Sequence, residues 1–141
     1  MRAGTENIYG IIGFSKALEI AHQEHEKDSA YILSLKKYMK QRLIETIPGV
    51  VFNGDPDGSS LYTVLSVGFP HSEKSEMLLF NLDINHICES GGSACSSGAN
   101  QGSHVINALT KEKQSTVRFS FSKYNTKEEI DQVITSLQSL L

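Results

Sequence analysis

The sequence has few of the residues that mark several large classes of protein. It contains two cysteines, three prolines and no tryptophan in 141 residues. The two cysteines, Cys88 and Cys95, cannot form a disulfide scaffold, and their spacing is unlike that of metal ligands, so we expect no metal site. No apolar run approaches the ~20 residues of a membrane helix, and the N-terminus has no signal-peptide pattern. We therefore expect a cytoplasmic protein without a membrane partner.

The sequence also lacks a basic excess. Thirteen Lys and Arg stand against sixteen Asp and Glu, which gives a net charge of −3. A protein that binds nucleic acid through phosphate contacts needs a basic patch or run, so this class is disfavoured. The length and the hydrophobic content of 39% suit one domain, which can bury about two-thirds of its unfolded surface.

Apolar residues at helical spacing predict two helices in the first third of the chain, over residues 7–26 and 30–46. Pro48 and Gly49 end the second helix. The apolar stripes are Ile11, Phe14, Leu18 and Ala21 in the first helix, and Ile32, Leu35, Met39, Leu43 and Ile47 in the second.

The remaining pattern alternates between short strands and short helices. Strands are predicted at residues 50–52, 61–67, 84–88 and 117–121. Helices are predicted after Ser72, over about 103–109, and from a capping box at Thr126 to the end, with the stripe Ile130, Val133, Ile134, Leu137 and Leu141. The fold class is α+β (α/β in the wider sense), a single domain with helices packed on a mostly antiparallel sheet.

The most unusual segment is the cysteine loop, Ser90–Gly98, in which every residue is small and Cys95 is the one strong latent nucleophile. A transfer reaction needs a thiolate that can approach its target and withdraw. The alternatives are a surface turn with an incidental cysteine, and a phosphate cradle at Gly91–Ser93 that lacks the lysine and helix of a P-loop. Cys88, in the apolar 84–88 segment, is predicted to be a small buried hydrophobe, and only proximity supports a disulfide with Cys95.

Arg118 lies in the strand predicted at residues 117–121. Strand geometry points its side chain away from the apolar face of Val117 and Phe119. A guanidinium matches a carboxylate in bidentate geometry. From the residues alone, an ion pair within the chain or a solvated face explains Arg118 better. The five histidines show no metal-ligand spacing and no catalytic set.

Taken in order, the motifs resemble those of the NifS/IscS-like cysteine desulfurases of the class V aminotransferase family. The resemblance extends from residue 2 to about residue 137 and rests on Arg2–Asn7, the cysteine loop, Arg118–Ser120 and Asn125–Asp131. It implies the small C-terminal domain of a fold-type I transferase that depends on pyridoxal 5′-phosphate. Such an enzyme converts L-cysteine to L-alanine and a protein-bound persulfide.

The resemblance also implies roles for three residues. Cys95 would carry the persulfide, Arg118 would bind the carboxylate of the substrate, and Thr5 would contact the cofactor phosphate of the partner subunit in a homodimer. The persulfide would pass to a sulfur-acceptor or scaffold protein for iron–sulfur cluster or thiolation pathways. Members of the family often carry a tail for docking that scaffold, which has no counterpart after Leu141.

No lysine of this sequence lies in a motif that resembles the family's cofactor-lysine motif. In the family, that lysine lies in a larger domain that precedes the motifs found here. We therefore expect residues 1–141 to be the C-terminal domain of a desulfurase, inactive alone, with no cofactor bound covalently and with an apolar face left uncovered. The alternatives are a stand-alone, non-enzymatic sulfur-carrier or thiol interaction module, and a decayed fragment with structural remnants only.

Overall fold

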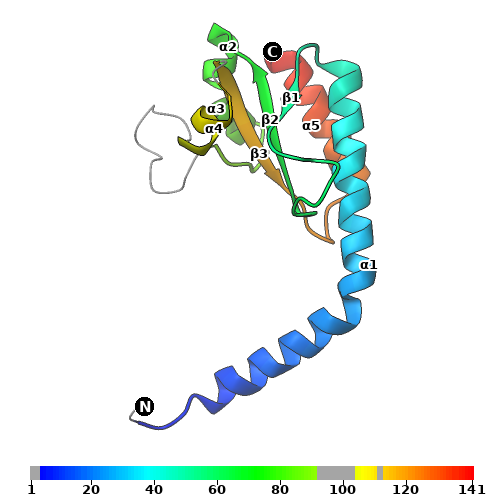
Figure 1. Cartoon of the computed structure of the whole chain (residues 1–141), viewed down its shortest axis with the longest axis vertical. Coiled ribbons are helices and arrows are strands. Elements are labelled where there is room, and N and C mark those ends of the chain that lie inside the picture. The colour runs from blue at the N-terminus through cyan, green and yellow to red at the C-terminus, as the bar shows by residue number, and fades with distance from the viewer. Residues whose placement is uncertain (1–3, 92–103, 111–112) are drawn as a thin grey trace.

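A computed structural model describes residues 4–91, 104–110 and 113–141, arranged as helices around a small sheet (Figure 1). The three strands form an antiparallel sheet in the order β1-β2-β3. This confirms the predicted α+β class. The elements are α1 (Ile8–Thr46), β1 (Val51–Phe52), β2 (Val64–Pro70), α2 (Glu73–Glu76), α3 (Leu78–Ile84), α4 (His104–Leu109), β3 (Gln114–Ser120) and α5 (Lys127–Leu140).

The prediction of two N-terminal helices was wrong, because α1 is a single helix of 39 residues. The expected break at residues 27–29 contains no glycine or proline, so nothing there interrupts the backbone hydrogen bonds. Asn7 caps the N-terminus by accepting a hydrogen bond from the Gly10 amide at 3.1 Å.

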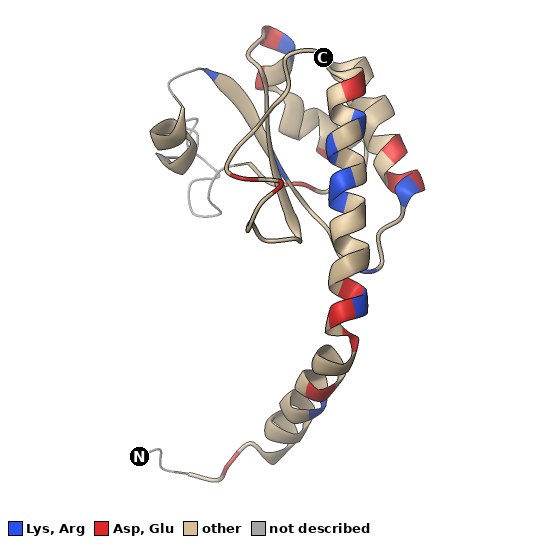
Figure 2. Ribbon diagram, turned by 45° about the vertical axis from the view of Figure 1, so that its right-hand side comes forward, with Lys and Arg blue, Asp and Glu red and all other residues tan. Residues whose placement is uncertain are grey.

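The first half of α1 extends away from the sheet as an arm, residues 8–23, in which every residue is exposed (Figure 1). Figure 2 shows few charges along the arm, where Lys16 and Glu19 pair with each other. The arm therefore presents uncovered apolar side chains to its surroundings. No helix among the described residues is both long and apolar enough to cross a membrane. The large exposed apolar side chains of the arm are Ile8, Tyr9, Ile11, Ile12, Phe14, Leu18 and Ile20.

The hydrophobic core lies against one face of the sheet. β2 and β3 contribute alternate residues to that face, as period-2 geometry requires. The second half of α1, α3 and α5 cover it, which confirms the stripe predicted from Ile32 to Ile47 and most of the stripe after Thr126. The buried residues are Ile32, Leu35, Met39, Leu43, Ile47, Leu65, Val67, Phe69, Leu78, Leu82, Val117, Phe119, Phe121, Ile130, Ile134 and Leu137.

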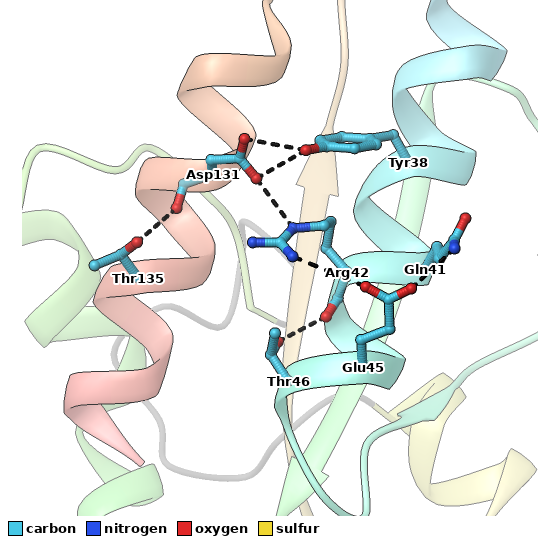
Figure 3. A network of polar contacts seen from close by, with 7 residues as sticks. All are labelled: Tyr38, Gln41, Arg42, Glu45, Thr46, Asp131 and Thr135. Atoms are coloured by element: carbon cyan, nitrogen blue, oxygen red, sulfur yellow. Dashed lines mark hydrogen bonds and ion pairs between the residues drawn. The ribbon is translucent and has the colours of Figure 1, made fainter.

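Polar contacts hold α5 against α1 beside the core (Figure 3). The Asp131 carboxylate accepts hydrogen bonds from the Tyr38 hydroxyl at 3.0 Å and from Arg42 Nε at 3.1 Å. The hydrogen bond to Asp131 raises the pKa of Tyr38, because it stabilises the protonated phenol. The predicted capping box is also present, with Thr126 and Glu129 each accepting a backbone hydrogen bond from the other.

The strand predicted at residues 84–88 was wrong. Helix α3 continues to Ile84 and ends in a Schellman motif, in which the amides of His86 and Ile87 donate to the carbonyls of Asp83 and Leu82 at 2.9 and 3.0 Å. His86 takes the left-handed position, with φ of 60°, where glycine is usual. The segment after it leaves the core, so Cys88 is exposed and the prediction of a buried thiol was also wrong.

Candidate functional site

Arg118 lies near the centre of β3, on the face of the sheet opposite the core. Its flanking residues Val117 and Phe119 are buried, whereas Arg118 is exposed, as the alternation predicts. Its partner across the sheet on β2 is Ser66. Among the described residues, no acidic side chain forms an ion pair with Arg118. That removes the ion-pair explanation for this part of the chain and leaves a guanidinium able to bind an anion.

Ser90, the first residue of the cysteine loop, joins β3 at Arg118. The two residues form an antiparallel bridge, with the Arg118 amide donating to the Ser90 carbonyl at 2.7 Å and the Ser90 amide donating to the Arg118 carbonyl at 3.2 Å. Arg118 Nε also donates to Ser90 Oγ at 3.0 Å. The beginning of the cysteine loop is thus fixed beside the arginine that the sequence analysis singled out.

Gly91 follows this bridge and lies close to the Leu79 side chain. A Cβ atom on Gly91 would lie 2.3 Å from Leu79 Cδ1 of α3. A side chain at this position would therefore require the Leu79 side chain to shift.

Of the other two predicted site residues, one lies outside the described residues and the other lies far from Arg118. Cys95 lies outside the described residues, as do Gly92 and Ser93 of the weaker phosphate-cradle hypothesis. Thr5 is exposed and precedes α1, at the end of the arm that lies farthest from the sheet (Figure 1). Arg118 is the predicted site residue whose surroundings the structure defines.

Cys88 lines an open groove of about 1000 Å³ rather than the core. The groove lies between the 85–88 segment, the end of β3 and the first turns of α5, and Glu128 and Asp131 are among its lining residues. Arg118 does not line it. The second thiol of the chain is therefore accessible but faces a different part of the surface from Arg118.

Glu89, between Cys88 and Ser90, has a perturbed acidity. Partial burial raises the pKa of its carboxyl to about 6, with a further contribution from the negative charge of Asp83. An acid whose pKa is higher in the folded state binds more protons when folded, so stability falls as the pH rises through the window from 4.5 to about 6.

We expect Glu89→Gln to stabilise the chain above pH 6 and to have no effect below pH 4.5. The expected increase in the free energy of unfolding above pH 6 is about 1 kcal/mol, because solvent screens a half-buried carboxylate. Urea unfolding at both pH values measures it, with the exposed Glu26→Gln as the matched control. A gain of equal size at both pH values would contradict the assignment to ionisation of Glu89.

The described residues do not complete a site for pyridoxal phosphate. A lysine that holds this cofactor needs a free amine directed into a cavity. Lys36 is the one buried lysine in the described ranges, and its Nζ instead donates to Ser60 Oγ at 2.8 Å and to the Leu61 carbonyl at 3.0 Å. Burial lowers its pKa. These contacts fix the turn before β2 and do not fit a covalent cofactor.

Sequence reasoning assigned no role to Ser90, because its contact with Arg118 joins residues 28 positions apart. No local spacing marks such a pair, and in the sequence Ser90 is one of several small residues of the cysteine loop. The alternating segment with a single central arginine drew attention to Arg118, and the family resemblance supplied its role.

The chain matches the family model of aminotransferase class-V over residues 1–133. It is 40% identical over 136 residues to cysteine desulfurase 2 of Trichormus variabilis, a match that covers 94% of this chain and 33% of that protein. It is 36% identical to the cysteine desulfurase NifS of Azotobacter vinelandii, with 99% of this chain and 35% of that protein covered. The chain thus spans about a third of the length of the curated relatives it matches.

The fold agrees with a solved structure of the same kind. The X-ray structure of a NifS-like protein from Rickettsia africae matches with a TM-score of 0.75 at 24% identity. The match covers 99% of this chain and 36% of that one. The arrangement of α1, the three-stranded sheet and α5 is therefore found in a larger chain.

Proposed function

Because the chain belongs to the aminotransferase class-V family, we propose that residues 1–141 are the C-terminal small domain of a cysteine desulfurase. In this role it supplies Arg118, which binds the carboxylate of L-cysteine, and Cys95, which receives the sulfur. The cysteine desulfurases from Trichormus and Azotobacter, to which it is similar along almost its whole length, support this assignment.

The observation that carries the proposal is the bridge between Ser90 and Arg118. Cys95 follows Ser90 by five residues, and five residues span at most about 18 Å. The Cα atom of Cys95 is therefore tethered within that distance of Ser90, which pairs with Arg118. A small amino acid substrate with a reactive sulfur requires one group that binds its carboxylate and a nucleophile close to that group.

The transfer balances without an external oxidant or reductant. The Cys95 thiolate attacks the sulfur of L-cysteine, a sulfur–sulfur bond forms, and the carbon–sulfur bond of the substrate breaks. The bonding electrons remain with the carbon, which takes up a proton to give L-alanine. Pyridoxal phosphate, when bound to the larger domain, supplies the electron sink for breaking that bond. The residues of this chain bind the substrate and accept its sulfur.

The remaining parts of the proposal concern assembly. Thr5, at the end of the arm far from the sheet, would reach the cofactor phosphate of the partner subunit in a homodimer. The uncovered apolar face of the arm supports burial against other protein. We place the enzyme in the cytoplasm, where a sulfur-acceptor or scaffold protein would take the persulfide to iron–sulfur cluster or thiolation pathways.

The test uses the pyridoxal phosphate holoenzyme in which this chain supplies the C-terminal third, with L-cysteine as substrate. We expect alanine from the holoenzyme and none from the 141-residue chain mixed with the cofactor. A holoenzyme that forms no alanine would contradict the proposal. If a complete desulfurase then loads Cys95 of the isolated chain with sulfur, the sulfur-carrier alternative replaces it.

A further inference from the structure

We infer that Ser90 is a positioning residue for Arg118: its hydroxyl holds Nε of the guanidinium and leaves the two Nη groups to bind a carboxylate end-on. The inference rests on the proposed function, because it takes the carboxylate of the substrate as the ligand of Arg118. It adds a residue and a binding geometry that neither the sequence pattern nor the family resemblance supplied.

The Ser90 hydroxyl is used twice on the same partner. Oγ accepts a hydrogen bond from Arg118 Nε at 3.0 Å and donates one to the Arg118 carbonyl at 3.4 Å. The two backbone hydrogen bonds of the bridge, at 2.7 and 3.2 Å, fix the main chain on which this hydroxyl sits. The Ser90 hydroxyl therefore contacts both the guanidinium and the main-chain carbonyl of Arg118.

The hydrogen bond between Ser90 and Nε determines how a carboxylate can bind the guanidinium of Arg118. A carboxylate can pair side-on with Nε and one Nη, or end-on with both Nη groups. Since Ser90 Oγ occupies Nε, the end-on edge is the one at which no described residue takes up a donor. Holding the long side chain in place before the ligand arrives also reduces the conformational entropy lost on binding.

The described residues on the other flank of Arg118 offer no comparable contact. Ser66 is its partner on β2, but Ser66 Oγ accepts from Asn53 Nδ2 at 3.3 Å. In the part of the chain that the structure describes, Ser90 supplies the one side-chain hydrogen bond to the guanidinium. Because Ser90 is also the first residue of the cysteine loop, one residue positions Arg118 and anchors the segment that carries Cys95.

The first experiment measures the contact itself in the 141-residue chain, by the rate at which the Arg118 Nε proton exchanges with water in NMR spectra. We expect Ser90→Ala to speed this exchange about tenfold, since the acceptor is lost. Ser90→Thr keeps the hydroxyl and is expected to exchange like the wild type. Ser66→Ala is the matched control, because it removes a hydroxyl from the opposite flank and leaves the Nε contact in place.

The second experiment measures the consequence in the holoenzyme. Ser90→Ala is expected to raise KM for L-cysteine about tenfold and to change kcat less than about twofold, with Ser90→Thr restoring the KM. Cysteamine, which has no carboxylate, is expected to inhibit the wild type and Ser90→Ala equally. If Ser90 had only a structural role, Ser90→Ala would weaken the binding of L-cysteine and of cysteamine to the same extent.

The outcomes separate this inference from the proposed function. Unchanged Nε exchange in Ser90→Ala, or faster exchange with an unchanged KM, would overturn the positioning role while leaving Arg118 as the carboxylate site. If Arg118→Met leaves the KM for L-cysteine unchanged, the proposed site fails, and the inference fails with it whatever the exchange rate.

Discussion

Replacing Arg118 by methionine is expected to lower kcat/KM of the holoenzyme for L-cysteine by about a hundredfold, mainly through KM. Methionine keeps much of the length of arginine but has no donor for a carboxylate. The change should cost little stability, because Arg118 is exposed and has no ion pair among the described residues. Steady-state kinetics and urea unfolding of the same variant separate the two effects.

Arg42→Met provides the matched control. Arg42 is also a partly exposed arginine, but its Nε donates to Asp131 and helps to join α1 to α5 (Figure 3). It should lower the unfolding free energy by about 1 kcal/mol and leave KM unchanged. Should Arg118→Met retain the wild-type KM, the carboxylate of the substrate binds elsewhere.

Replacing Cys95 by serine is expected to abolish sulfur transfer, because a serine hydroxyl of nearly the same size does not form a nucleophilic anion at neutral pH. The measurement is alanine formation together with the sulfur passed to a thiol acceptor. Cys88→Ser is the matched control and should keep the wild-type rate, since Cys88 lines the groove beside α5 rather than the sheet face of Arg118.

The exposure of Cys88 changes how the two thiols must be told apart. A buried Cys88 would have made alkylation under native conditions selective for Cys95. Because Cys88 is exposed, its alkylation says nothing about sulfur transfer. The pair of serine variants does discriminate, and loss of transfer in Cys88→Ser with transfer retained in Cys95→Ser would reverse the assignment.

The core residues could be predicted because apolar side chains recur at the regular spacing of a helix or a strand. The stripe from Ile32 to Ile47, the alternation around Arg118 and the capping box at Thr126 are local patterns, and each is confirmed. The strand β2 was found three residues early, since its start at Val64 depends on pairing with Ser120 rather than on composition. Patterns within a few residues identify elements, and their partners set the boundaries.

The errors come from contacts that no local pattern shows. The end of α3 carries no glycine signal, because His86 takes the position in the Schellman motif where glycine is usual. The segment with Cys88 was therefore predicted to be a strand. Two helices were predicted with a break at residues 27–29, whereas α1 is continuous there and Glu24 and Asp28 bind Lys123, which joins α1 to the turn before α5. The role of Ser90 follows from its hydrogen bond with Arg118, which only the structure shows.

The most direct test of the central claim is to follow the sulfur itself. The holoenzyme is incubated with L-cysteine that carries a heavy sulfur isotope, free thiols and persulfides are trapped, and the peptides with Cys88 and Cys95 are weighed by mass spectrometry. We predict one heavy sulfur atom on the Cys95 peptide, formed together with an equal amount of alanine. Heavy sulfur on Cys88, or alanine formed without any label on Cys95, would contradict it.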